Sequence, residues 1–101
     1  MIARFWRGVT PKSKADEYFE YLQKTGLKEY QSTDGNRGVY VFRRVEKDRA
    51  VFLLMSRWES FDAIKRFAGP NYEKAVYYPE DKKYLLELEP DVVHYEILAQ
   101  P

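Results

Sequence analysis

The single histidine, His94, is the side chain in this sequence best suited to move a proton at neutral pH. An imidazole with an ordinary pKa of about 6.5 can accept a proton from a phenol, and neighbouring carboxylates raise its basicity. His94 lies in a β-forming segment near the end of the chain. The register of that strand decides whether it faces a pocket or shares a side with Glu96. His94 is therefore either a general base or a structural histidine.

Arg4 and Trp6 lie two residues apart on the first predicted strand, so their side chains point to the same side of it. A guanidinium beside an indole, when partly buried, can stabilise the negative charge that develops on an enolate or phenolate. The alternative is an arginine that pairs with a carboxylate across a dimer. Arg4 and His94 are therefore the candidate catalytic residues.

Aromatic residues are abundant, with 9 Tyr, 6 Phe and 2 Trp making up 17% of the chain. Large flat side chains bury much area in a small core and also line pockets for flat ligands. Trp58 either closes the core or offers a stacking surface at a pocket mouth. Tyr77 and Tyr78 precede a proline in a predicted loop, where hydroxyl groups can reach a substrate. The candidate substrate contacts are Trp6, Tyr40, Trp58, Phe67, Tyr77 and Tyr78.

Several kinds of site lack the residues they need. There is no cysteine, and a lone histidine without a spaced carboxylate cluster is a poor metal ligand set. The five glycines form no phosphate-binding motif, and neither Ser56 nor Ser60 stands in a nucleophile motif. We therefore expect neither a metal nor an organic cofactor.

The charge is balanced, because 17 Lys and Arg stand against 16 Asp and Glu. No overall field draws the chain to nucleic acid or to an anionic membrane. Two arginines interrupt the apolar start of the chain, Met1 to Arg7, where a signal peptide would be continuous. We expect a soluble cytoplasmic protein, and the lack of cysteine fits a reducing compartment.

Hydrophobic periodicity and turn residues predict one domain over residues 1–101, with the element order βαββαβ. Thr10 and Pro11 fit the start of the first helix, Gly26 fits its left-handed cap, and Ser60 fits the cap of the next helix. The predicted strands are Ile2–Val9, Arg37–Val45, Ala50–Trp58 and Val92–Leu98, and helices are predicted up to Lys24, from Ser60 to Ala68, over Asn71–Val76 and over Glu80–Glu87.

This order is that of an α+β, ferredoxin-like antiparallel sheet with its helices on one face. We expect the third strand to run parallel to the first, which would place Trp58 at the same edge of the sheet as Trp6 and Gly8. A ligand pocket would then lie between the sheet and the helices.

The strands are apolar on both sides. Val51, Leu53 and Met55 alternate with Phe52 and Leu54, although the helices can cover only one face. We therefore expect a homodimer in which two copies cover each other's second face. The alternative is a monomer that exposes some aromatic side chains.

The stretch Leu53–Ile64, the helix residues Ala15–Tyr18 and the loop Tyr77–Glu80 together resemble the antibiotic biosynthesis monooxygenase-like family of dimeric α/β barrels. The resemblance implies a shared barrel with a pocket in each subunit. It also implies a monooxygenase that uses no metal and no cofactor and acts on a small aromatic or polyketide-like substrate, which is deprotonated and passes an electron to dioxygen. The alternative is a non-catalytic relative that binds a small hydrophobic ligand or has a regulatory role.

Two other activities fit less well. Haem-degrading members of the family use an Asn on the first strand with a Trp and a His after the third, whereas Trp6, Phe67 and Tyr77 stand at the roughly matching positions. The strand Arg37–Phe42 resembles the basic, glycine and aromatic pattern of RNA-recognition modules, but it falls on the second strand rather than the third. We therefore expect neither haem degradation nor RNA binding.

Overall fold

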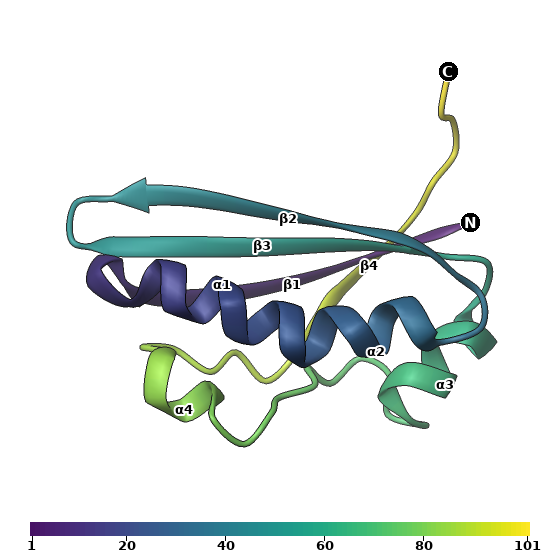
Figure 1. Cartoon of the computed structure of the whole chain (residues 1–101). Helices are drawn as coiled ribbons and strands as arrows, with labels where there is room; N and C mark the ends of the chain where they lie inside the picture. Colours follow the sequence, from purple (N-terminus) through teal and green to yellow (C-terminus); the bar gives the residue numbers. More distant parts are fainter.

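The computed structural model describes residues 1–101 as four strands and four short α-helices (Figure 1). The elements are β1 (Ile2–Pro11), a 3₁₀ turn (Lys12–Lys14), α1 (Ala15–Lys24), α2 (Gly26–Ser32), β2 (Asn36–Glu46), β3 (Arg49–Trp58), α3 (Phe61–Ala68), α4 (Asp81–Tyr84) and β4 (Val93–Glu96).

The strands form one antiparallel sheet in the order β2-β3-β1-β4. All helices lie on the same side of the sheet, with α1 and α2 running along it end to end, and the other side carries no helix (Figure 1). This confirms the predicted ferredoxin-like α+β fold. No helix in the chain is long and apolar enough to cross a membrane.

The predicted parallel pairing of the first and third strands is wrong. β1 and β3 are antiparallel, with Ile2 opposite Trp58 and Gly8 opposite Phe52. The helical crossover after β1 returns the chain so that β2 runs parallel to β1. β3 lies between these two strands and is antiparallel to both. Trp58 therefore lies at the far end of the sheet from Gly8.

The start of the first helix also differs from the prediction. Thr10 and Pro11 continue β1 in register with Ala50 and Arg49, and α1 begins only at Ala15. Thr10 and Pro11 are suited to the start of a helix, but here they pair with β3 and belong to the sheet.

Gly26 is not a left-handed cap, because it begins the further helix α2. Leu27 and Tyr30, three residues apart, place α2 against the core. This tertiary packing gives helical structure to part of the polar segment that we expected to be irregular.

Helix α3 is as predicted. The Ser60 hydroxyl oxygen accepts a hydrogen bond of 3.2 Å from the backbone N–H of Ala63, and Gly69 ends the helix with a φ of 85°. The helix predicted over Asn71–Val76 is wrong, and the helix predicted over Glu80–Glu87 is confirmed only in its single turn α4, because the chain between α3 and β4 is otherwise irregular.

Candidate functional site

One row of side chains crosses the helix-covered face of the sheet. His94 on β4 is opposite Arg4 on β1, and Arg4 is opposite Ser56 on β3. The register therefore places the two candidate catalytic residues side by side, on the face where a pocket was expected. Sequence alone left this face undecided for His94.

Arg4 carries a buried guanidinium that no carboxylate neutralises. The residue is 1% exposed, Nη1 donates to the Tyr30 hydroxyl at 3.4 Å, and Nη2 donates to the Lys74 carbonyl at 3.1 Å. Nε has no hydrogen-bond partner. Burial lowers the pKa of Arg4, and the nearby Tyr30 hydroxyl opposes this shift. No carboxylate of the same chain pairs with Arg4, and the alternative of a carboxylate across a dimer stays a prediction.

Aromatic rings surround this guanidinium. The Arg4 carbon Cζ lies 5.3 Å from the centre of the Phe67 ring, which stacks on Tyr30 at 4.4 Å. Burial also raises the pKa of Tyr30, so its hydroxyl stays protonated. A cation with a free N–H in an apolar surround is well placed to stabilise an anion formed nearby.

His94 is held between two rings, with the centre of its imidazole ring 5.8 Å from the centre of the Phe61 ring and 5.4 Å from that of the Tyr72 ring. Its buried Nε2 has no partner. Burial lowers the pKa of His94, the charge of Arg4 lowers it further, and Glu73 opposes the shift. The imidazole is therefore neutral at pH 7 and able to accept a proton.

A second buried polar group, Asp81, was not identified from the sequence. It is 2% exposed, its Oδ1 accepts from the Tyr18 hydroxyl at 3.0 Å, and its Oδ2 accepts from the Tyr78 backbone N–H at 2.6 Å. Burial raises the pKa of Asp81, and these two hydrogen bonds oppose the shift. No basic side chain pairs with this carboxylate.

A small cavity borders Asp81 but does not reach Arg4 or His94. Its volume is about 20 Å³, which is room for roughly one water molecule. Tyr30 belongs to its wall and also contacts Arg4. The wall is formed by Trp6, Tyr18, Leu22, Gly26, Tyr30, Leu54, Phe67, Val76, Tyr78 and Asp81. The space between sheet and helices is therefore largely filled by side chains.

Three of the predicted substrate contacts, Trp6, Phe67 and Tyr78, line this cavity. Tyr77 packs its ring against Trp6 at 6.2 Å. Trp58 is fully buried and donates from Nε1 to the Ser56 hydroxyl at 2.8 Å, so it closes the core without reaching the cavity. The cavity thus joins residues from β1, β3, α1, α2, α3 and the segment before β4.

Tyr40 does not belong with this group. Its side chain points to the opposite face of the sheet, because it lies between Val39 and Val41, which pack against the core. The prediction that Tyr40 shares a pocket with Trp6 is therefore wrong. The alternation of the strand decides the face, and the register of β2 could not be read from its sequence.

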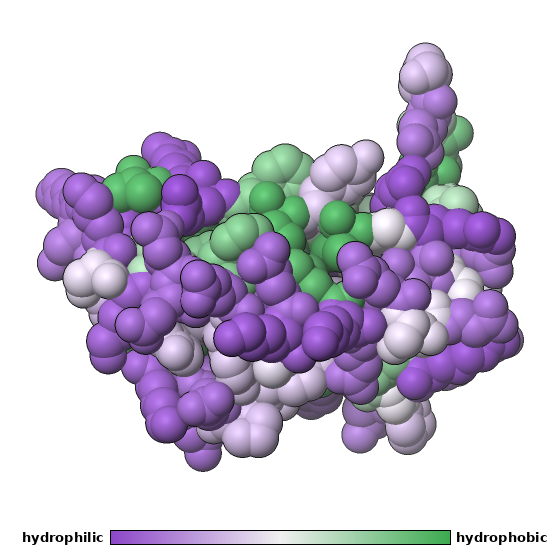
Figure 2. Space-filling view, viewed as in Figure 1, coloured by the Kyte–Doolittle hydropathy of each residue, from purple (hydrophilic) through white to green (hydrophobic).

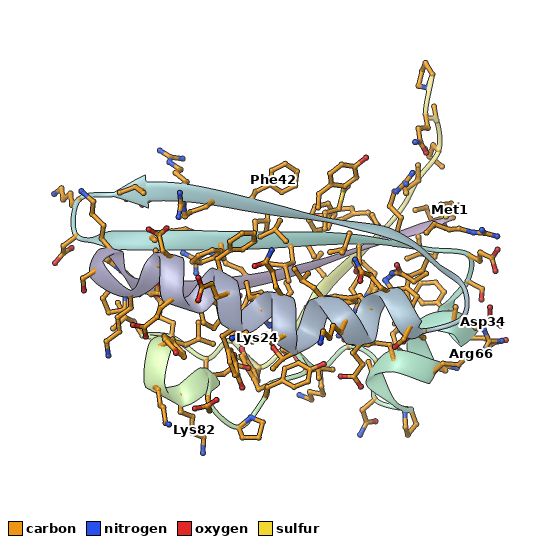
Figure 3. All side chains as sticks on the ribbon, in the orientation of Figure 1. Met1, Lys24, Asp34, Phe42, Arg66 and Lys82 are labelled. Atoms are coloured by element: carbon orange, nitrogen blue, oxygen red, sulfur yellow. The ribbon has the colours of Figure 1, made fainter.

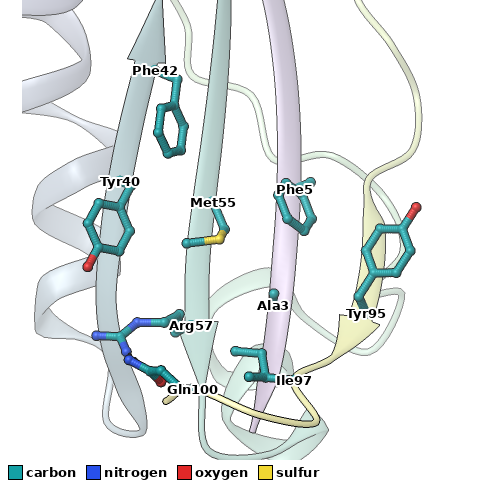
Figure 4. A pocket seen from close by; sticks show the side chains of 9 residues that line it. All are labelled: Ala3, Phe5, Tyr40, Phe42, Met55, Arg57, Tyr95, Ile97 and Gln100. Carbon is teal, nitrogen blue, oxygen red and sulfur yellow. Dashed lines mark hydrogen bonds between the residues drawn. The ribbon is translucent and has the colours of Figure 1, made fainter.

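The helix-free face of the sheet carries an apolar trough of about 560 Å³. It is lined by Ala3, Phe5, Tyr40, Phe42, Met55, Arg57, Tyr95, Ile97 and Gln100 (Figure 4). Figure 2 shows hydrophobic surface gathered above the sheet, and Figure 3 shows Phe42 on the side away from α1. Both faces of the sheet are thus apolar, as the strand pattern predicts.

The fold is shared with solved structures over nearly the whole chain. A proposed antibiotic biosynthesis monooxygenase from Bacillus cereus has a TM-score of 0.65 at 16% identity, covering 99% of this chain and 95% of its own. The protein Rv0793 from Mycobacterium tuberculosis has a TM-score of 0.63 at 17% identity, covering 98% and 96%. A variant of MhuD with two manganese protoporphyrin IX molecules per active site has a TM-score of 0.63 at 13% identity, covering 100% and 98%.

The chain has the fold of the antibiotic biosynthesis monooxygenase-like proteins. No protein-family model matches the sequence, and no curated protein matches it. At these identities the likeness establishes the antibiotic biosynthesis monooxygenase-like fold alone.

The porphyrin bound by MhuD does not fit the interior of this chain. The cavity of about 20 Å³ is far smaller than a porphyrin. The one histidine, His94, is enclosed between the Phe61 and Tyr72 rings. The residues of this interior therefore do not fit a porphyrin.

Proposed function

We propose that the chain is a homodimeric, cofactor-independent monooxygenase that oxidises a small phenolic aromatic molecule between its sheet and its helices. The observation that carries the proposal is the Arg4–His94 pair: two neighbouring side chains, each with a buried nitrogen that lacks a partner. One is a cation able to stabilise a phenolate, and the other is a neutral base.

In the proposed reaction, His94 accepts the hydroxyl proton of the substrate and Arg4 stabilises the resulting phenolate. The phenolate gives one electron to dioxygen, and the two radicals combine into a ring-bound peroxide. Loss of water from this peroxide leaves a quinone. One phenol and one dioxygen thus give one quinone and one water, so no external reductant is needed.

The cavity must enlarge before such a substrate can enter, because about 20 Å³ holds no aromatic ring. The irregular segment that carries Tyr77 and Tyr78 forms part of the wall and is the part that the proposal requires to move. Tyr78 contributes to the cavity wall and is anchored to α2 through its hydroxyl, which donates to Glu29. Substrate binding is expected to displace this segment.

The test is oxygen consumption with a panel of phenols and naphthols. His94→Gln removes the base and should lower kcat by about 100-fold or more. Arg4→Met should lower kcat by about 100-fold. Leu86→Gln, at an exposed position away from the cavity, is the control and should keep full activity. Absence of oxygen uptake across the panel, or equal rates in all variants, contradicts the proposal.

A non-catalytic ligand-binding or regulatory protein is the second candidate. The observation that favours it over an oxygenase is the nearly filled interior, which leaves no room for an aromatic substrate beside His94. Such a protein would bind a naphthol in calorimetry without consuming oxygen, and His94→Gln would leave its affinity unchanged.

The homodimer is supported by the trough on the open face. Tyr40 is 51% exposed and Phe42 is 49% exposed, and their rings stack on each other at 6.2 Å. A patch of this kind is unusual on the surface of a monomer. The same face of a second copy would cover it and complete the barrel.

A further inference from the structure

Asp81 and Trp6 lie in the wall of the same cavity, and neither belongs to the Arg4–His94 pair. The Asp81 carboxylate is buried without a cation to balance it. The Trp6 side chain is 5% exposed, and its Nε1–H has no acceptor. A buried N–H without a partner carries a cost of desolvation that a bound acceptor would recover.

The two groups make opposite demands on a ligand atom. The Trp6 N–H needs an acceptor, whereas the free lone pairs of the Asp81 carboxylate can take a donated hydrogen bond. A hydroxyl group satisfies both. A ligand carboxylate satisfies Trp6 but meets the charge of Asp81, and an ether or ketone leaves Asp81 without a donor.

We propose that this cavity anchors a neutral hydroxyl group of the ligand, with Trp6 donating to its oxygen and Asp81 accepting its hydrogen. The inference rests on the proposed function, since the anchored hydroxyl is a second one, remote from the hydroxyl that reacts beside Arg4 and His94. Phe67 contacts Arg4 and also lines the cavity, so the anchor and the Arg4–His94 pair share this residue, and a ligand that uses both must displace the rings packed on Phe67. The substrate class is therefore a dihydroxylated aromatic ring system.

The contacts of Asp81 make a mild substitution available. In Asp81→Asn, the side-chain oxygen can still accept from the Tyr78 N–H, and the new amide can donate to the Tyr18 hydroxyl. The fold is preserved while the negative charge is lost. Trp6→Phe removes the N–H donor and keeps most of the ring.

The experiment is calorimetric titration under nitrogen, so that no oxidation takes place, with a naphthalenediol and the hydroxynaphthoic acid that carries a carboxylate in place of one hydroxyl. The wild type should bind the diol at least about tenfold more tightly than the acid. Asp81→Asn should lose most of this preference, and Trp6→Phe should weaken diol binding by about tenfold. Leu86→Gln should match the wild type.

An unchanged preference in Asp81→Asn overturns the anchor, as does a failure of the diol to bind the wild type at millimolar concentration. The preference is measured without turnover. If the wild type prefers the diol but consumes no oxygen, the oxygenase is refuted and the anchor stands. If it consumes oxygen but shows no preference for the diol, the anchor is refuted and the oxygenase stands.

Discussion

At the scale of single residues, the main feature is the buried charge of Arg4. Burial lowers the pKa of the neighbouring base His94, and this charge lowers it further. Arg4 has no carboxylate partner and lies opposite His94 across the β1–β4 pair. A buried and unpaired cation is costly for stability. Replacing it by an apolar residue of similar length is therefore expected to preserve the fold, so that Arg4→Met tests function more than folding.

The lowered pKa of His94 predicts a pH dependence of stability with a definite sign. In the unfolded chain the imidazole titrates near its ordinary pKa of about 6.5, whereas in the fold burial and Arg4 keep it neutral to lower pH. Between these two pKa values the unfolded state binds more protons, so the free energy of unfolding falls as the pH drops below about 6.5.

Urea unfolding at several pH values between 5 and 8 measures this effect. The wild type should lose more stability towards pH 5 than His94→Gln does, while Asp81 titrates equally in both proteins and cancels in the difference. Parallel profiles for the two proteins would show that His94 does not stay neutral in the fold.

Individual residues of the site were only partly predictable. His94 and Arg4 stood out because their chemistry is rare in this sequence, and the pairing of β1 with β4 then brought them together. Asp81 carried no signal, because an acidic residue at the start of a helix is normally exposed. Tyr30 could have been found from its spacing of three residues from Leu27, which marks one apolar helix face.

At the scale of elements, close packing within β1 makes a glycine indispensable. A methyl group at Gly8 would lie 2.4 Å from atom Cη2 of the Trp6 ring, which folds back along the strand. Gly8→Ala should therefore destabilise the protein by about 1–3 kcal/mol through overpacking, measured as the change in the urea midpoint.

Gly26→Ala is the matched control, because a methyl group there meets nothing closer than 3.5 Å and Gly26 begins helix α2. It should be neutral or stabilising by up to about 1 kcal/mol, since alanine favours a helix more than glycine does. Equal losses at both positions would mean that the Trp6 ring does not lie over Gly8.

The elements that follow local patterns were predictable, and those fixed by distant contacts were not. The strands and α3 agree with the sequence because their alternation, turns and cap are local signals. The segment after α3 is held by backbone hydrogen bonds to residues far along the chain, such as Ala75 N–H to the Pro90 carbonyl and Val92 N–H to the Glu73 carbonyl. No periodicity within the segment reveals such partners, so the helix over Asn71–Val76 was predicted in error and the one over Glu80–Glu87 was predicted too long.

At the scale of the whole molecule, the proposed dimer depends on the open face of the sheet. Phe42 stands on this face, half exposed, beside Tyr40 and away from the helices. Phe42→Glu is therefore tolerated by a single copy, whose circular dichroism should not change. In a dimer it would bury two unpaired carboxylates, each at a cost of several kcal/mol.

Sedimentation equilibrium at micromolar concentration should give a mass of about twice 12.1 kDa for the wild type and about 12.1 kDa for Phe42→Glu. The dissociation constant should rise by roughly 100-fold or more, because each 1.4 kcal/mol corresponds to a factor of ten. Leu86→Glu places the same charge at an equally exposed leucine outside the trough and should remain a dimer. A wild type that sediments as a single chain would contradict the shared barrel, and the trough would then be the solvent-exposed face of a monomer.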